Sequence, residues 1–258
     1  MQALRSRSVV KRGGIVYLCT DDIAPCPVQP RKNFDEDAFV TTGKIVDNHV
    51  TFKNAVSLLK LHVPSGVTSV SLKGFAGENI VGGTSVSATL KPAGESFTEG
   101  DYYIAILPVT FNTGFKVIYE DAAKSDIAIK KNTSKVVFPV NGGQDITAAT
   151  ASLTWIPNPL ISEDDLIYFV GHQTAYAGEA AKLGQDIALT KQWTPVDLKG
   201  TLDGQGHVVS GLNVTAGDDA GMFSSLSEDA ALKNITVEGT ITLLADTHPA
   251  QAGLVANL

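Results

Sequence analysis

One short segment contains side chains that could act as an acid, a base and a charge stabiliser. Lys199, Asp203 and His207 lie around an Asp-Gly-Gln-Gly sequence. On one outward face, such groups could cleave a polysaccharide or bind calcium. The glycines between them would aim each side chain differently, however, and Asp-Gly and Gln-Gly are typical of turns in which aspartate bonds the local backbone. We therefore interpret the segment as a turn and predict no catalytic residue.

The remaining polar residues have no spacing typical of a metal site. The five histidines are scattered, and Cys19 and Cys26 have no histidine nearby. We interpret both cysteines as incidental, and a disulfide that closes a short loop is the alternative. The acidic run 163–165 predicts a helix start rather than a calcium site. The sequence contains no Walker loop, nucleophile elbow or zinc-protease signature, so we expect no cofactor and no metal.

Aromatic rings could stack on sugars or contact another protein. Four are weak candidates for such contacts: Tyr102, Tyr103, Trp155 and Trp193. Tyr102 and Tyr103 are neighbours at the start of an expected strand, so one ring must point outward while the other faces the core. We favour a core position for these aromatics, and for Trp193 a packing role beside the following Thr-Pro.

Composition limits the class of protein. The 258 residues leave room for two domains, and 43% hydrophobic with 18% charged residues is a globular composition. The 24 glycines and 11 prolines favour turn-rich β structure. A net charge of -7 argues against a nucleic-acid partner, because such proteins usually carry a basic stripe. No stretch approaches the roughly 20 apolar residues that span a bilayer.

The first 33 residues differ from the rest. Basic residues precede a short apolar run at 15–18, as in a signal peptide, but the run is too short and no small-residue cleavage site follows. We expect an irregular lead-in at residues 1–33, which does not place the protein in the cell.

From residue 34 onward, short apolar segments alternate with turn residues. The sequence predicts strands at residues 59–63, 67–72, 85–90, 102–107, 114–119 and 136–140. In 114–119, alternation places Phe115, Val117 and Tyr119 on one face and Lys116 and Ile118 on the other. Short strands without intervening helices predict an antiparallel sandwich at 34–145. Asn-Gly-Gly and Pro-Asn-Pro sequences then indicate a linker, which we place at 146–160.

A helix is predicted next. Ser162 with Asp165 three residues later is a capping box, and Leu166, Phe169 and Val170 form its apolar face. We expect it to end between residues 172 and 178. Two short strands, 181–184 and 186–189, should follow.

A repeat occupies the C-terminal part. Ala-Gly-Met-Phe-Ser-Ser-Leu at 220–226 recurs as Ala-Gly-Leu-Val-Ala-Asn-Leu at 252–258, a spacing of 32 residues by subtraction. Such spacing is typical of solenoids. Between the copies, Asn234 is expected to turn a corner. The residues expected to point inward are Leu232, Ile235 or Val237, and Ile241. We predict a parallel β-helix that is cut inside a repeat at Leu258, and expect the natural protein to continue.

Residues 35–145 resemble the fimbrillin-like domain of Bacteroides-type bacteria. The segments that carry this resemblance are 51–54, 58–61, 70–72, 82–83, 102–108 and 114–117. The family supplies pilus subunits and surface lipoproteins. Its N-terminal signal peptide, lipid-bearing cysteine and first strands have no counterpart here, which implies an incomplete sandwich with an exposed edge.

Residues 160–258 resemble the GLUG-motif repeat region of Bacteroides surface proteins. The similar segments are the helix start at 162, then 186–189, 193–196 and 200–207, and both copies of the repeat. The resemblance implies a capping helix followed by the first coils of a right-handed parallel β-helix at 161–258.

Together the resemblances imply a mainly β, non-enzymatic surface or pilus-associated protein, structural or adhesive. The implied location is extracellular or on the outer membrane, through a lipid anchor that is absent from this chain. The implied partners are host or bacterial surface glycans or proteins, or other pilus subunits. Two alternatives are a fragment of a β-helical lyase or hydrolase and a pilus tip or accessory subunit that polymerises by strand donation.

Overall fold

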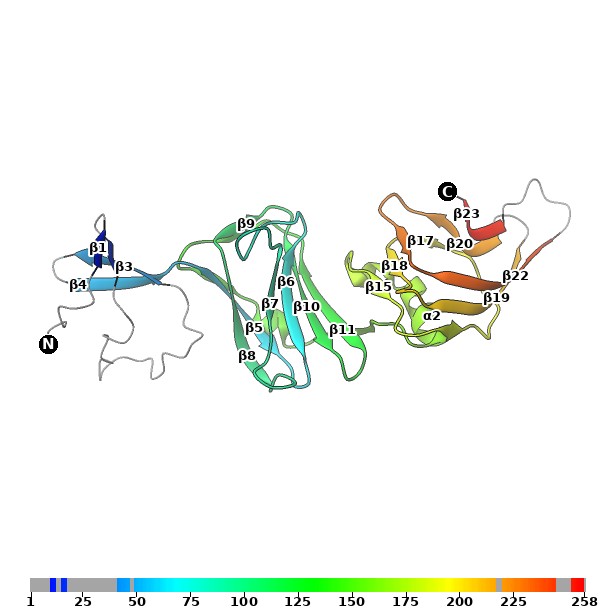
Figure 1. Cartoon of the computed structure of the whole chain (residues 1–258), viewed down its shortest axis with the longest axis horizontal. Coiled ribbons are helices and arrows are strands. Elements are labelled where there is room, and N and C mark those ends of the chain that lie inside the picture. Colours follow the sequence, from blue (N-terminus) through cyan, green and yellow to red (C-terminus); the bar gives the residue numbers. More distant parts are fainter. Residues whose placement is uncertain are drawn as a thin grey trace.

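The chain is mainly β, with its strands in several separate sheets (Figure 1). The computed structural model describes residues 10–12, 15–17, 41–46, 49–216, 220–244 and 252–257. Two antiparallel hairpins come first, and their strands are β1 Val10–Arg12, β2 Ile15–Tyr17, β3 Thr41–Val46 and β4 His49–Asn54. The lead-in, expected to be irregular, thus contains the β1–β2 hairpin. Cys19 and Cys26 lie outside the described residues.

Two larger sheets follow. One has the strand order β14-β11-β10-β6-β7 and the other β13-β5-β8, while β9 and β12 form a small separate pair. Neighbouring strands are antiparallel as predicted, except that β13 runs parallel to β5. The strands are β5 Ser57–Val63, β6 Ser69–Gly74, β7 Ser87–Leu90, β8 Gly100–Ile106, β9 Val109–Phe111, β10 Phe115–Asp121, β11 Asp126–Asn132, β12 Val136–Phe138, β13 Gly143–Asp145 and β14 Trp155–Pro157.

These two sheets enclose one apolar core. Along β5 every second side chain is buried, beginning with Ser57 and continuing through Leu59, Leu61 and Val63, as the alternating sequence predicts. Inward residues of β6, β8 and β10 complete the cluster. We call it the two-sheet core.

The central strand β10 of the five-stranded sheet is buried on both of its faces. Val117 and Tyr119 of β10 face the two-sheet core. Lys116 and Ile118 point to the opposite side, as alternation predicts, yet both are also buried. Residues that follow β14 pack on the second face of β10. The alternation within β10 cannot reveal this, because those residues lie far away in the sequence.

The segment 146–160, expected to be a linker, contains regular structure. Helix α1 (Thr147–Thr150) lies beside β5 and bonds to its backbone. The Thr150 hydroxyl accepts a hydrogen bond from the His62 N–H at 2.9 Å. Strand β14 then pairs with β11. The breakers at its ends mark turns, and Trp155-Ile156 between them is apolar enough to join a sheet.

The remaining described strands form three parallel sheets, β15-β18-β21, β16-β19-β22 and β17-β20-β23. After helix α2 (Glu163–Gly171) and a 3-10 helix (Gln173–Tyr176), the chain adds one strand to each sheet in turn and repeats this circuit twice. We call each circuit a coil. The strands are β15 Ala181–Lys182, β16 Ile187–Ala188, β17 Val196–Leu198, β18 Thr201–Asp203, β19 Val208–Ala216, β20 Ala220–Leu226, β21 Ala231–Lys233, β22 Thr236–Leu243 and β23 Ala252–Asn257.

The strand register agrees with the repeat. Ala220 pairs with Ala252, so the two copies stack directly with the predicted spacing of 32 residues. On another sheet Leu202 pairs with Leu232, a spacing of 30 by subtraction. The turns between strands therefore differ in length, and the number of residues per coil differs between sheets. Asn234 has a left-handed φ of 49°, which confirms its predicted corner.

Glycines allow the coils to stack closely. Gly211 has φ +73°, and a Cβ there would lie 2.4 Å from the Leu189 carbonyl oxygen of the coil before. Gly206 has φ +88°, but a Cβ there would meet nothing within 4 Å. We expect Gly211→Ala to lower the free energy of unfolding by about 3 kcal/mol and Gly206→Ala by about 1 kcal/mol, measured by urea denaturation. Equal losses would contradict the close approach of the coils.

Candidate functional site

One contact between distant parts of the chain joins the five-stranded sheet to α2 and the coils. Ile118, Ile127 and Ile156, from β10, β11 and β14, point away from the two-sheet core. They belong to the apolar cluster that contains Leu166 and Phe169 of α2 and continues through the interior of the coils. We call this cluster the coil core and the region around the three isoleucines the junction.

Strand β14 shows how the junction is built. Trp155 packs against the two-sheet core, whereas the next residue, Ile156, is buried in the coil core. Neighbouring residues of a strand point to opposite faces, so a three-residue strand reaches both cores. Figure 1 shows the two larger sheets on one side and α2 together with the coils on the other.

A charged cluster lies beside these apolar contacts. The Lys116 Nζ lies 2.8 Å from Oε1 of Glu179, and the Lys73 Nζ lies 3.0 Å from its Oε2. Lys116 also donates to the Ala177 carbonyl at 2.9 Å, and its Nζ lies 5.6 Å from the centre of the Phe75 ring. The Lys116 side chain is only 9% exposed and that of Glu179 24%. Because both charges are largely removed from water, each is stabilised by the opposite charge of the other.

The pKa of Glu179 reflects two opposing effects. Burial raises it, but hydrogen bonds from Lys116 and Lys73 outweigh burial and lower the pKa below its ordinary value. Glu179 is therefore ionised at neutral pH. It joins two strands of the five-stranded sheet to the loop after the 3-10 helix.

Backbone groups at the junction are also satisfied by side chains. The Tyr176 hydroxyl donates to the Pro157 carbonyl at 2.6 Å. The Asn158 side chain donates to the Ala180 carbonyl at 3.0 Å and accepts from the Lys182 N–H at 2.9 Å. These bonds fix the turn after β14 against the first strand of the coils.

The acidic run at 163–165 begins α2, as predicted. The Ser162 hydroxyl accepts from the Asp165 N–H at 3.1 Å, the expected N-cap bond. Glu163 accepts hydrogen bonds from Thr190 and Lys191, and Asp164 pairs with Lys191 at 2.8 Å. Within the described residues, no three His, Cys, Asp or Glu side chains are grouped as metal ligands.

The stability of the coils is expected to depend on pH through Glu163. Hydrogen bonds from the Thr190 hydroxyl and then from the backbone of residues 191 and 190 lower its pKa from 4.5 to about 2. A lowered native pKa stabilises the fold above the unfolded value, and this contribution is lost as pH falls from 4.5 towards 2. We expect Glu163→Gln to lower the urea midpoint at neutral pH, with the difference vanishing near pH 2. A constant difference, or an equal effect of the exposed control Glu95→Gln, would contradict this role.

The four aromatic candidates have different environments. Tyr102 turns inward, where its ring meets Phe97 edge-on at 4.9 Å, while Tyr103 is 46% exposed. The prediction that one ring faces out and the other faces the core is thus confirmed. Trp155 is half-buried against the two-sheet core. Trp193 is 6% exposed and its indole N–H donates to the Met222 carbonyl at 2.7 Å, so it packs in the coil core and does not present a contact surface.

Tyr103 stands in a polar surface on the outer face of the β13-β5-β8 sheet. Lys60 is its cross-strand partner, and the Lys60 Nζ lies 3.0 Å from Asp101 and 3.9 Å from Asp145. His62 Nδ1 lies 3.2 Å from Asp101 Oδ1. The hydrogen bond with Asp101 raises the pKa of Lys60, and the same bond lowers the pKa of Asp101.

Lys199, Asp203 and His207 do not form a common site. Asp203 accepts from the Gln205 N–H at 3.0 Å and from Asn234 at 3.1 Å, so it holds its own turn and the next coil. His207 Nδ1 lies 3.1 Å from Asp186 Oδ1. Among the described residues, no hydrogen bond or ion pair joins one of the three to another. Their positions agree with the turn interpretation.

Lys199 borders a shallow, open hollow of about 230 Å³ at the end of α2. Its lining is Val170, Gly171, Gln173, Thr174, Val196, Asp197 and Lys199. The Gln173 side chain crosses it, donating to the Asp197 carbonyl at 2.8 Å and accepting from the Lys199 N–H at 2.6 Å. The nitrogen and the oxygen of the Gln173 side-chain amide are thus both hydrogen-bonded within the protein.

Comparison with known proteins identifies no relative. No family model matches the sequence, and neither the curated proteins nor the solved structures gave a match. Among the described residues, no helix is long and apolar enough to cross a membrane.

The junction residues were not identified from the sequence. Lys116 occupies an outward position in an alternating strand, where a lysine is expected to meet solvent. Its partner Glu179 lies in a Gly-Glu-Ala segment that matches no motif. The only signal was that Ile118, a large apolar residue, shares the outward face with Lys116.

Proposed function

We propose that this chain is a non-enzymatic structural or adhesive protein of the bacterial surface. A fimbrillin-like sandwich, formed by the two larger sheets, holds the first coils of a right-handed parallel β-helix. We further propose an extracellular or outer-membrane location in a Bacteroides-type bacterium. The partners would be glycans or proteins of a host or bacterial surface, or other pilus subunits.

The junction is the observation that supports this proposal. An adhesive or structural module must transmit force, and a flexible linker between two parts would let one move freely against the other. Here Ile118, Ile127 and Ile156 are at most 6% exposed and belong to the coil core. The sandwich therefore holds the coils through packed side chains rather than through a tether.

The β-helix part of the proposal is supported by the stacking of coils. Three successive circuits contribute to the same three parallel sheets, and apolar residues of each circuit enter a shared core. One coil cannot bury its apolar side alone, so such an array gains stability from its neighbours.

Labelling of intact cells tests the proposed location. An antibody raised against the purified chain would be applied to Bacteroides-type cells that carry the gene, before and after permeabilisation. We expect equal labelling in both conditions and loss of labelling after protease treatment of intact cells. Labelling that requires permeabilisation would overturn a surface role. An antibody to a periplasmic protein is the matched control for cell integrity.

A further inference from the structure

The outer face of the β13-β5-β8 sheet carries the polar surface around Tyr103. Buried residues alternate along β5, so Lys60 and His62 point outward. On β8, Ile104 and Ile106 are buried, so Asp101 and Tyr103 point outward. The register places Lys60 opposite Tyr103 and His62 opposite Asp101, giving a compact set of four side chains on one face.

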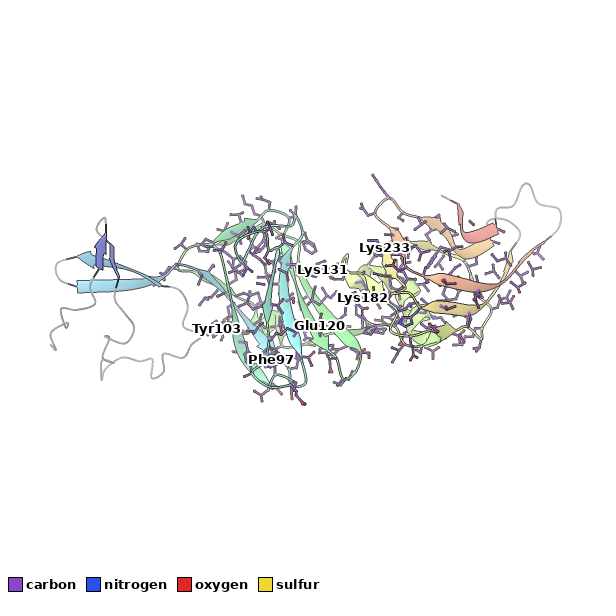
Figure 2. All side chains as sticks on the ribbon, viewed as in Figure 1. Phe97, Tyr103, Glu120, Lys131, Lys182 and Lys233 are labelled. Carbon is purple, nitrogen blue, oxygen red and sulfur yellow. The ribbon has the colours of Figure 1, made fainter. Side chains whose placement is uncertain are left out.

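The Tyr103 ring is accessible on this face. It is 46% exposed, whereas the neighbouring Tyr102 packs on Phe97. The next outward residue on β8 is Ala105, whose side chain is a single methyl group. Figure 2 shows Tyr103 on the side of the two larger sheets that faces away from the coils, so the junction does not obstruct it.

The carboxylates around the ring already contact Lys60 and His62. Lys60 lies between Asp101 and Asp145, and His62 lies between Asp101 and Glu99, with its Nε2 3.8 Å from Glu99 Oε1. An anionic ligand would be repelled by the three carboxylates, and a cationic ligand would compete with Lys60 for Asp101 and Asp145. An uncharged ligand with both hydroxyl donors and acceptors avoids both costs.

We propose that this face binds a neutral carbohydrate, with a pyranose ring stacked on Tyr103. The C–H bonds on one face of a pyranose form an apolar surface that fits an aromatic ring. Its hydroxyl groups would accept from Lys60 and donate to Asp101, which the ion pairs hold in place. This inference rests on the adhesive role proposed above and names the ligand class and the residues that contact it.

Saturation-transfer NMR with the purified whole chain tests the proposal. The probes are methyl β-galactopyranoside, methyl β-glucopyranoside and methyl α-mannopyranoside at millimolar concentration. We expect transfer to the ring protons of at least one of them. Tyr103→Phe should retain binding because the ring remains, and Tyr103→Ala should weaken it about tenfold.

Val137→Ala, which shortens an exposed side chain on β12, is the control for a general loss of apolar surface. The thermal midpoint of Tyr103→Ala should equal that of the parent, because Tyr103 is outside the core. Absence of transfer to all three sugars, or equal transfer in Tyr103→Ala, would overturn the carbohydrate site. The labelling experiment does not depend on Tyr103. A surface protein without this site would be labelled on intact cells but would show no sugar binding, whereas a protein away from the surface would not be labelled on intact cells.

Discussion

Glu179→Gln is expected to lower the free energy of unfolding by about 2 to 3 kcal/mol. The substitution leaves the Lys116 ammonium, on a side chain that is 9% exposed, beside a neutral amide instead of a carboxylate. Among the described residues, its other contacts are the Ala177 carbonyl and the Phe75 ring, and neither carries a charge. Breaking a fully buried pair costs about 3 to 5 kcal/mol. We expect a smaller loss because Glu179 is itself 24% exposed. Urea denaturation followed by circular dichroism measures the change.

A second substitution separates the uncompensated charge from other effects. In Lys116→Met/Glu179→Gln, the buried charge is removed, so much of the lost stability should return. The control is Asp164→Asn, which breaks an exposed pair with Lys191 and should change stability by less than about 1 kcal/mol. Equal effects of Glu179→Gln and Asp164→Asn would mean that the junction cluster is an ordinary surface pair.

Trp193→Ala is expected to lower the free energy of unfolding by about 4 kcal/mol. The side chain is 6% exposed in the coil core, and its removal leaves a large cavity. It also leaves the Met222 carbonyl, which lies 2.7 Å from the indole nitrogen, without this donor. The measurement is again the free energy of unfolding in urea.

Two matched variants test the reason for this loss. Trp193→Phe keeps most of the volume but loses the hydrogen bond, so we expect a loss of about 1 to 3 kcal/mol. Trp155→Ala removes the other tryptophan, which is only half-buried, and should cost less than Trp193→Ala. A mild Trp193→Ala with altered binding to sugars would instead support the contact role that the sequence left open.

Local patterns predicted those parts of the fold whose cause lies nearby in the sequence. The alternation in β5 gave its buried face, and the Ser162 capping box gave the start of α2. The repeat gave the stacking of β20 on β23, because equivalent residues of successive coils occupy equivalent places. In each of these, the residues of one short segment or of two similar segments contain the whole signal.

The junction could not be predicted because its cause is distant. Lys116 resembles a solvent-facing residue in the sequence, but Ala177 and Glu179, more than 60 positions later, contact its ammonium. Ile118 is buried with Leu166 and Tyr176 in the coil core. The same packing explains why the expected linker contains β14, whose Trp155 and Ile156 face different cores. For Tyr103, alternation predicted that one ring of the pair faces outward, but the ionic partners around it depend on the register of three strands.

The most direct test asks whether the two cores unfold together. The two tryptophans of the chain report them separately, since Trp155 packs on the two-sheet core and Trp193 lies in the coil core. In Trp193→Phe, fluorescence follows the sheets; in Trp155→Phe, it follows the coils. Within each variant we expect the fluorescence and circular dichroism transitions in urea to coincide. Ile118→Asp, which places a charge in the junction, should separate them. Separate transitions without Ile118→Asp would show two independent parts joined by a tether and would contradict rigid presentation of the coils.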